Sequence, residues 1–405
     1  MKKLLFIILM SAVVFCGCSD KDTDLNGENY DGSYNMISEG TSVHIVEEEQ
    51  EREDTEVYIP EGMVTPYASK KLNSELLKIY DDIVEAVRNG EDKIPMVRDA
   101  SDYNPLLNLA AVEQLGFGHV SGRKAGEYDL DTGYFPVEFT YRLTVSEMSE
   151  MNRRAEQAAD DIMAAVTDDM QAYDKLKYFH DYLILNCESS RDYEYANTVY
   201  GALVEGKALC EGYSKAFSYL CNRAGIENMI VTGLTNEAHM WNMVKVDGNW
   251  YHVDVTWDKP GGTLADAFPD MIMYQYFMVT DSVIENDHQI VTISSPPPQA
   301  LSTNESYFHK EGFYIGEADD IEKVMENAFR RAVEARAATA MVKFDTTNLM
   351  YSVMNDVVEA GENGGDFLKD IIDGISAENG VTLNIGWTDF YSKYRILVFI
   401  IEYSE

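Results

Sequence analysis

This 405-residue chain has few basic residues and no clustered cysteines. The first feature argues against nucleic-acid binding and the second against a metal site. Lys and Arg number 32 against 70 Asp and Glu, which gives a net charge of −38. A protein this acidic repels phosphate backbones, so nucleic acid is excluded as a partner. The five cysteines form no CxxC pair and no cluster with histidines, and no loop offers the alternating oxygen ligands of a calcium site. We therefore expect no metal and no other cofactor.

The N-terminal apolar run is too short to span a bilayer. Leu4–Val14 follows two lysines, whereas a spanning helix needs about 20 apolar residues. A positive start, an apolar middle and a small-residue end are typical of an export signal. The end, Phe15-Cys16-Gly17-Cys18, resembles a bacterial lipoprotein signal in which Cys18 becomes the lipidated first residue. A plain secreted protein and an uncleaved anchor are the alternatives.

The segment after this signal is more acidic than the rest of the chain. Residues 20–60 hold thirteen acidic residues against Lys21 and Arg52 and have few bulky apolar side chains. Such a segment cannot bury enough surface to offset chain entropy. We therefore expect residues 1–17 to be a signal peptide and residues 18–65 to be a disordered tether. The lipid would hold the protein on the membrane, exposed outside the cytoplasm.

Apolar periodicity divides the remainder into two folded units of mixed helix and sheet, an α+β protein. The prolines at 296–298 mark the boundary, because they cannot continue a helix or a central strand. The first unit, residues 66–293, is predicted to contain helices at Ser69–Arg88, at Ser146–Val166 and from a Thr167 cap to Asn186, and a strand at Phe135–Leu143. The stripe containing His180 and Cys187 indicates core residues.

The second unit, residues 301–405, reads as β-α-β-α-β-β and contains no motif that assigns it a role. Its expected elements are a strand at Phe308–Ile315, a helix at Asp320–Ala338, a strand at Ala340–Phe344, helices within Asn348–Ile372, and strands at Val381–Trp387 and Ile396–Ile401. We interpret it as an accessory domain.

Cys210 is predicted to begin a helix. Gly201 and Gly206 indicate a tight loop before it, and an apolar stripe continues from Glu211 to Ala224. The helix dipole and unpaired N–H groups at this end favour a thiolate, which is the form that attacks a carbonyl. A small buried cysteine is the alternative. A disulfide with Cys221 is excluded, since eleven residues of one helix span about 16 Å, but one with Cys187 stays open.

Two alternating runs joined by Asp247-Gly248 predict a β-hairpin. This turn sets Val246 opposite Asn249, so His239 and Asp254 become diagonal neighbours on one sheet face, about 7–8 Å apart at the backbone. A carboxylate there can fix the imidazole tautomer and leave the other nitrogen for a thiol. A surface ion pair is the alternative.

These segments resemble the transglutaminase-like superfamily, a branch of papain-like cysteine enzymes. The resemblance rests on the segment 206–213 around Cys210, on His239-Met240-Trp241, and on the segment 250–258 around Asp254. It implies a helix carrying the cysteine packed on an antiparallel sheet that carries the histidine and aspartate. It also implies a catalytic triad of Cys210, His239 and Asp254, with Trp241 and Trp257 packing the site.

Acyl transfer also needs hydrogen-bond donors for the oxyanion. The Cys210 N–H is one candidate donor and the Tyr200 hydroxyl is another, although a structural tyrosine is the alternative. We expect Cys210 to attack an amide of a peptide or protein substrate at the cell wall or surface, and water to release the thioester. A crosslinking transglutaminase and a non-catalytic peptide- or glycan-binding lipoprotein are the alternatives. A buried Cys210 sulfur would count against catalysis.

Overall fold

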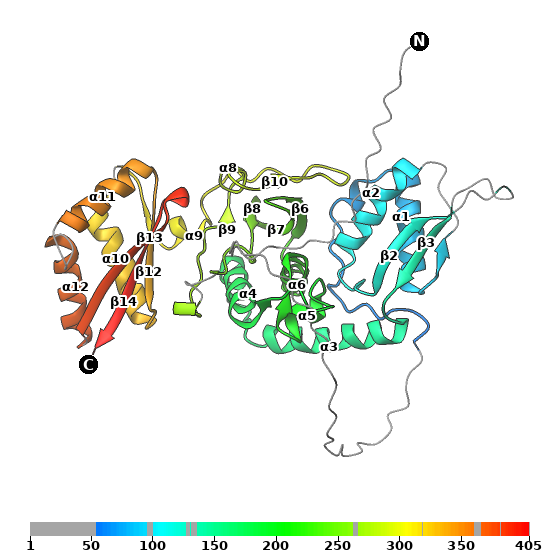
Figure 1. Ribbon diagram of the computed structural model, residues 1–405, viewed down its shortest axis with the longest axis horizontal. Helices are drawn as coiled ribbons and strands as arrows, with labels where there is room; N and C mark the ends of the chain where they lie inside the picture. The colour runs from blue at the N-terminus through cyan, green and yellow to red at the C-terminus, as the bar shows by residue number, and fades with distance from the viewer. Residues whose placement is uncertain are drawn as a thin grey trace, which may run out of the picture.

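The computed structural model describes residues 54–94, 100–126, 130, 136–261, 266–317, 319–359, 366–380 and 382–404. Three parts follow one another along the long axis, with the N-terminal helices at one end, a central sheet and helices, and a C-terminal sheet at the other end (Figure 1). The mixed helix and sheet content confirms the predicted fold class. No helix in the described ranges is long and apolar enough to cross a membrane. The predicted signal, including Cys18, lies outside these ranges.

The N-terminal part packs two helices beside a three-stranded antiparallel sheet of order β1-β3-β2. Its predicted first helix is divided, because Leu72 is extended and the Asn73 side chain caps the second piece by accepting from Glu75 and Leu76 N–H groups. The elements are η1 (Ser69–Lys71), α1 (Ser74–Arg88), β1 (Lys93–Ile94), α2 (Ala100–Glu113), β2 (Val120–Ala125) and β3 (Val137–Tyr141).

The predicted tether extends too far toward the C-terminus. Val57 and Met63 are fully buried, and the Val57 N–H donates to the Arg88 carbonyl. The Asn152 side chain of α3 (Val145–Met163) donates to the Tyr58 carbonyl. Residues 54–65 therefore belong to the fold, because their few apolar side chains find a surface to cover and their backbone groups find partners.

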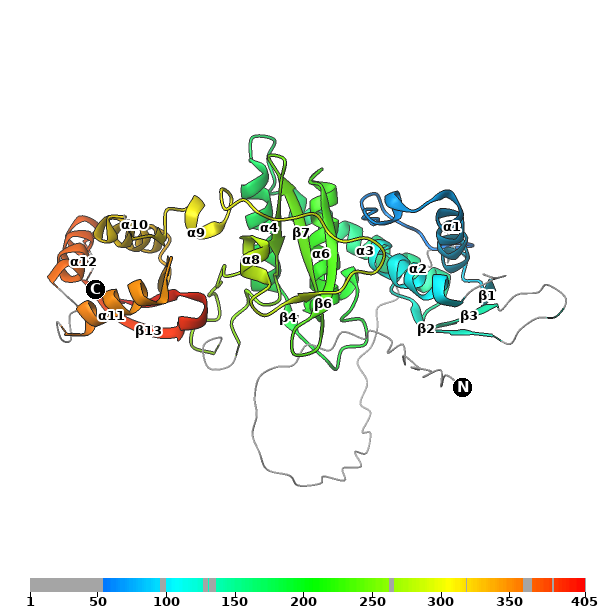
Figure 2. The ribbon, with the colours of Figure 1, turned by 90° about the horizontal axis from the view of Figure 1, so that it is seen from above.

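The central part holds a five-stranded antiparallel sheet of order β10-β6-β7-β8-β9, against which the cysteine-bearing helix packs (Figure 2). The predicted hairpin is confirmed: Val246 pairs with Asn249, and Asp247 and Gly248 take the left-handed conformation of its turn. The sheet consists of β6 (Asn228–Leu234), β7 (Ala238–Val246), β8 (Asn249–Val253), β9 (Phe277–Val279) and β10 (Gln289–Ile290).

The helices around this sheet follow the predicted order with one shifted start. Thr167 does not cap the third helix; its hydroxyl donates to Asp169, and the helix begins after Gln171. The remaining elements are α4 (Ala172–Asn186), β4 (Glu188–Ser189), α5 (Val199–Leu203), β5 (Lys207–Ala208), α6 (Cys210–Arg223) and α8 (Asp281–Ile284).

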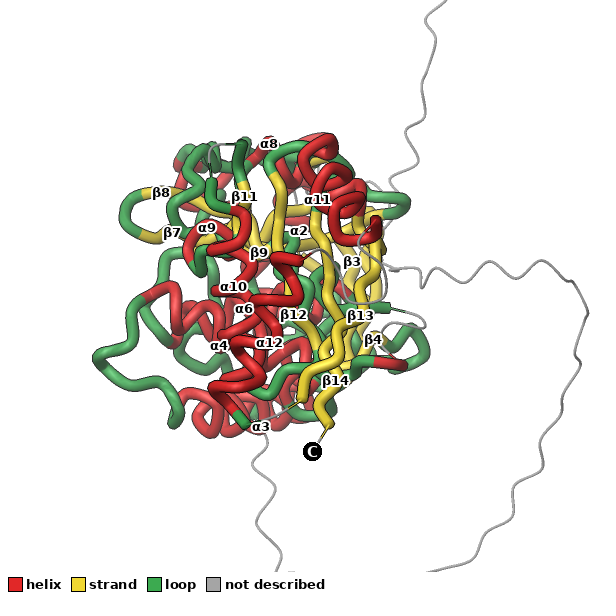
Figure 3. The backbone as a smooth tube through the Cα atoms, turned by 90° about the vertical axis from the view of Figure 1, so that its left-hand side faces the viewer, coloured by secondary structure: helices red, strands yellow, loops and turns green. Residues whose placement is uncertain are grey.

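The C-terminal part has a four-stranded sheet of order β11-β12-β14-β13, with α10 and α12 side by side against it (Figure 3). The predicted strand at Phe308–Ile315 is wrong in its first half, which is a short helix followed by a turn at Gly312. The elements are α9 (Tyr307–Lys310), β11 (Tyr314–Ile315), α10 (Ile321–Glu334), β12 (Thr339–Phe344), α11 (Thr347–Glu359), α12 (Asp366–Asn379), β13 (Thr382–Tyr391), η2 (Ser392–Tyr394) and β14 (Ile396–Ser404).

The proline-rich boundary does not separate two independent cores. Ala300 is fully buried, and its N–H and carbonyl both bond to Asp281 in α8. One apolar cluster continues from Phe277 in the central sheet to Phe308 and Phe344 of the C-terminal part. The accessory unit is thus packed on the central unit.

Candidate active site

Cys210 is the first residue of α6, as predicted. The preceding residue, Leu209, has an extended backbone and offers no side-chain acceptor to the first N–H groups of the helix. Its own N–H donates to the Ala196 carbonyl at 2.8 Å, which fixes the helix start. Gly212 permits this close approach, because a Cβ there would lie 2.2 Å from the same carbonyl oxygen. The geometry is the one in which a helix N-terminus favours a thiolate.

The strand that carries His239 is tied directly to this helix. The Asn242 side chain on β7 donates to the Ser214 carbonyl and to the Ser218 hydroxyl, both at 3.0 Å, on α6. All three residues are buried. These bonds fix how β7, and with it His239, lies across the helix that Cys210 begins.

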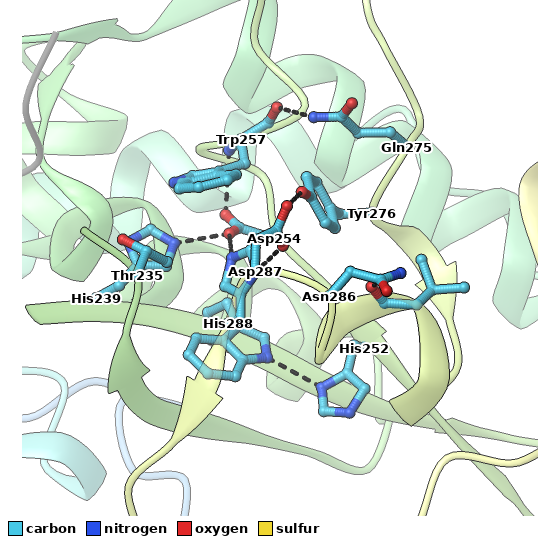
Figure 4. Close-up of polar contacts among 12 residues, drawn as sticks. Thr235, His239, His252, Asp254, Trp257, Gln275, Tyr276, Asn286, Asp287 and His288 are labelled. Atoms are coloured by element: carbon cyan, nitrogen blue, oxygen red, sulfur yellow. Dashed lines mark hydrogen bonds and ion pairs between the residues drawn. The ribbon is translucent and has the colours of Figure 1, made fainter. Parts of the chain in front are cut away.

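The Asp254 carboxylate is fully buried and accepts four hydrogen bonds (Figure 4). Oδ1 accepts from the backbone N–H groups of Thr256 (3.0 Å) and Trp257 (3.1 Å), which form a turn directly after β8. Oδ2 accepts from His239 Nε2 at 2.7 Å and from His288 Nε2 at 3.1 Å. Every lone-pair direction of the carboxylate is therefore used.

The protonation of Asp254 follows from these contacts. Burial alone would raise the pKa of this carboxyl group, but the charge of and hydrogen bonds from His239 and His288 hold it below its ordinary value. An ionised carboxylate only accepts, so His239 carries its proton on Nε2. Nδ1 is then the nitrogen with the lone pair, which is the tautomer that the predicted triad requires.

His288 is the site residue to which the sequence assigned no role, since it follows α8, 34 residues after Asp254. Its Nδ1 bonds to Asp287 Oδ1 at 2.7 Å, and its Nε2 bonds to Asp254. Burial lowers the pKa of His288, but these hydrogen bonds raise it above its ordinary value overall. Since two carboxylates accept from its two nitrogens, the ring is an imidazolium.

The ligand atoms of His239, Asp254 and His288 lie within 4.8 Å of one another, close enough to surround a metal ion. Both nitrogens already donate to the same oxygen of Asp254. A metal would displace both protons from a cluster that is at most 2% exposed. The geometry thus favours a series of hydrogen bonds through His239, Asp254 and His288, here called the hydrogen-bonded relay, over a metal site.

The two predicted tryptophans line this relay. Trp241 stacks on the His239 ring at a centroid distance of 6.0 Å, and Trp257 lies 5.8 Å from it. The Trp241 indole N–H donates to His252 Nδ1 at 3.0 Å, so the other nitrogen of His252 carries its proton and donates to Asp281. His252 therefore braces Trp241, a role that its strand position alone did not reveal.

Tyr200 is placed differently from the expected oxyanion donor. Its hydroxyl accepts from Arg154 at 2.6 Å and donates to Glu205 at 2.5 Å. Its ring packs in a separate apolar cluster with Val57 and Met148. These contacts support the structural alternative for Tyr200, and the Cys210 N–H is the remaining candidate donor from the sequence analysis.

The other predicted core residues are buried as expected. His180 lies between Asp181 (2.9 Å) and Asp258 (3.1 Å) with no exposed surface. Cys187, Cys210 and Cys221 are all thiols, so the disulfide between Cys187 and Cys210 that the sequence left open is not formed. Burial raises the pKa of Cys187 to about 12 and that of Cys221 well above its ordinary value. Neither is a reactive thiolate at neutral pH.

The site is closed in this structure. Cys210 and Asp254 are 0% exposed and His239 is 1% exposed. The burial that the sequence analysis named as evidence against catalysis is therefore observed, since a polypeptide cannot reach a sulfur with no exposed surface. Catalysis would require a movement that opens the start of α6.

Residues 156–255 match the family model of the transglutaminase-like superfamily, a range that includes Cys210, His239 and Asp254. The chain carries a transglutaminase-like domain. Domains of this superfamily are associated with cysteine-protease and acyl-transfer chemistry. His288 and the C-terminal unit lie outside the matched range.

Kyphoscoliosis peptidase of Homo sapiens is 27% identical over 126 residues, covering 27% of this chain and 19% of the relative. The Mus musculus protein is 27% identical over 129 residues with the same coverage. The chain thus spans about a fifth of the length of these relatives.

Two solved structures are also similar to the chain. A TGase shares 15% identity and a TM-score of 0.26, with 42% of this chain and 51% of the other covered. A Cytophaga hutchinsonii protein described as a candidate cysteine protease shares 11% identity and a TM-score of 0.25, with 43% and 70% covered. At these TM-scores, the superpositions carry no argument about mechanism.

Proposed function

We propose that this protein is a thiol acyl-transfer enzyme that hydrolyses peptide or amide bonds through Cys210, His239 and Asp254. In this mechanism the Cys210 thiolate attacks the carbonyl carbon and forms a thioester, while His239 protonates the leaving amine. His239 then removes a proton from water, which attacks the thioester and regenerates the thiolate. Asp254 keeps the imidazole in the required tautomer throughout.

The single observation that carries the proposal is the buried hydrogen bond from His239 Nε2 to Asp254 Oδ2 at 2.7 Å. Burying an ionised carboxylate is costly unless all its lone pairs are satisfied. Here the carboxylate accepts from His239, which lies on β7, and β7 is hydrogen-bonded to α6, the helix that begins at Cys210. Nucleophilic catalysis by a thiol needs this arrangement of carboxylate, imidazole and cysteine. The family match over the same residues supports the same chemistry.

The cellular setting belongs to this proposal. An N-terminal signal ending at Cys18 and an acidic segment after it would anchor the enzyme to a membrane by a lipid, outside the cytoplasm. The substrate would then be a peptide or protein at the cell surface. Crosslinking is the same chemistry with a lysine amine replacing water as the acceptor.

A second candidate function is favoured by the complete burial of Cys210. In that reading the domain binds a peptide or glycan without turnover, and the polar cluster around Asp254 only stabilises the fold. The two functions predict opposite thiol reactivity in the folded, reduced protein.

The test is covalent labelling of the reduced full chain by a chloroacetamide probe at neutral pH, read by intact mass and peptide mapping. Among Cys187, Cys210 and Cys221, the three cysteines of the folded part, we expect a label on Cys210 alone, loss of that label in Cys210→Ala, and much slower labelling of Cys210 in His239→Ala. Cys187→Ala is the matched control and should label like wild type, because the high pKa of Cys187 keeps it unreactive. No label on folded wild type would support the binding function instead.

Incubation with a peptide library, with and without a primary amine, then separates the acceptors. Fragments of lower mass support hydrolysis by the active protein. Products that carry the amine in place of water support crosslinking and would overturn our preference for hydrolysis.

A further inference from the structure

The hydrogen-bonded relay does not end at His288 but continues into the C-terminal unit. Asp287 holds His288 through Oδ1, and its Oδ2 accepts from the Tyr394 hydroxyl at 2.7 Å and from Lys393 Nζ at 2.9 Å. Both donors lie in η2, the short turn that joins β13 to β14. A segment more than 100 residues later in the chain therefore contacts the residue that orients His288.

Tyr394 contacts Asp287 in a largely buried environment, whereas Lys393 contacts it from solvent. The Asp287 side chain is 9% exposed, and the fully buried Tyr276 also donates to its Oδ2 at 2.7 Å. The Tyr394 ring meets the Tyr276 ring edge-on at 5.7 Å. Lys393 is 57% exposed, so its ion pair is screened by water, and Tyr394 is the stronger of the two contacts.

Two carboxylates, a second imidazole and three aromatic rings face His288. Asp254 and His239 lie on one side and Asp287 lies on the other, while the rings of Trp241, Trp257 and Tyr276 surround the imidazole. In the part of the chain that the structure describes, the negative groups bonded to the ring are these two carboxylates. Weakening the hold on Asp287 would therefore loosen His288, which supplies one of the two side-chain donors to Asp254.

We propose that the C-terminal unit completes the active site, with Tyr394 and Lys393 as positioning residues that hold Asp287 and, through His288 and Asp254, orient His239. This inference rests on the proposed function. It gives the accessory unit a role that its own sequence did not indicate: thiol reactivity depends on its docking. The hydrogen bonds in this series strengthen one another, because each charged bond fixes the position of the group that makes the next bond.

The experiment compares iodoacetamide alkylation of Cys210 against pH in the full chain, with EDTA present so that no metal enters the cluster. The test variant is Tyr394→Phe/Lys393→Met. The control is Tyr314→Phe/Lys369→Met, which removes another tyrosine–aspartate bond of 2.7 Å and another lysine–aspartate pair from the same unit.

We expect wild-type alkylation to have a pH midpoint well below the value of about 8.5 for a free thiol. The test variant should shift this midpoint upward and react about tenfold more slowly at pH 6, the effect of losing roughly one charge-assisted hydrogen bond. The control should match wild type within twofold.

The outcomes separate the two proposals. A wild-type midpoint at or above that of a free thiol, or no alkylation of folded protein, rejects the proposed function itself. A reactive wild type whose test variant matches the control rejects the role of the C-terminal unit alone. If the double variant unfolds, Tyr394→Phe decides the question, because it keeps the ring packing and loses only the hydroxyl; we then expect a slowing of about threefold at pH 6.

Discussion

Replacing Asp254 by asparagine should abolish thiol reactivity while costing comparatively little stability. The asparagine carbonyl can keep the two bonds that Oδ1 accepts from the Thr256 and Trp257 N–H groups. Its amide then points at His239 and His288, where the carboxylate accepted from both rings. His239 can accept an amide N–H by moving its proton from Nε2 to Nδ1. His288 can accept one by losing the proton on Nε2.

The magnitudes follow from this exchange. Four charge-assisted bonds become neutral bonds that remain satisfied, so we expect a loss of about 2–3 kcal/mol in the free energy of unfolding. Asp254→Ala removes the acceptor of the Nε2 atoms of two buried imidazoles and should cost about 3–5 kcal/mol. Asp254→Asn should affect thiol reactivity far more than stability, because His239 in the exchanged tautomer presents Nδ1–H to the thiol and no longer accepts the proton of the thiol. The expected fall in alkylation rate near neutral pH is on the order of 10³–10⁴.

The assay pairs urea unfolding, which gives the free energy and the m-value, with alkylation of the reduced protein across pH 5–9. The reasoning is refuted if Asp254→Asn alkylates within threefold of wild type at pH 6. It is also refuted if the asparagine and alanine variants lose the same stability, since imidazoles with and without a partner at Nε2 would then be equivalent.

Three further predictions follow from the same structure. Gly212→Ala should destabilise the protein by about 1–3 kcal/mol in urea and slow Cys210 alkylation, because the new methyl meets a backbone oxygen at 2.2 Å; Gly374→Ala, where no atom lies within 4 Å, should not. Val57→Ala should lower the free energy of unfolding by about 2 kcal/mol if the segment before residue 66 is docked, and an unchanged urea midpoint would contradict that docking. The free energy of unfolding, measured across pH 3–9, should fall on both sides of a plateau. The depressed pKa of Asp254 makes its contribution present above about pH 4 and lost in acid, and the raised pKa of His288 makes its contribution present below about pH 6.5 and lost as pH rises through the folded value. A monotonic rise of stability toward pH 9 would contradict the imidazolium at position 288.

The pairing of His239 with Asp254 was predictable because it depends on local rules. An Asp-Gly turn fixes the register of a two-stranded hairpin, and the side-chain period of two places both residues on one face. Cys210 was predictable for the same reason, since a loop followed by an apolar stripe defines where a helix begins. The positions of these three residues required no knowledge of distant segments.

The misplaced elements share the opposite property. Thr167 is the exception, because its hydroxyl donates to the carboxylate of Asp169, a contact two residues away, and the helix begins only after Gln171. The segment Phe308–Ile315 was predicted to be one strand, but its first residues form a short helix whose Phe308 side chain packs on the central unit. Val57 looked like part of a tether because a sparse apolar residue gains burial only from a surface that other segments build.

The sequence by itself therefore determined the mixed fold class, the hairpin register and the residue types that form the relay. Only the tertiary structure decided that a second histidine shares Asp254, that Tyr394 and Lys393 reach Asp287, and that the thiol is covered. The physical reason is that local periodicity fixes neighbours within one element or hairpin. Contacts between residues 34 to more than 100 positions apart depend on how whole units pack, and packing is set by the sum of many weak apolar contacts.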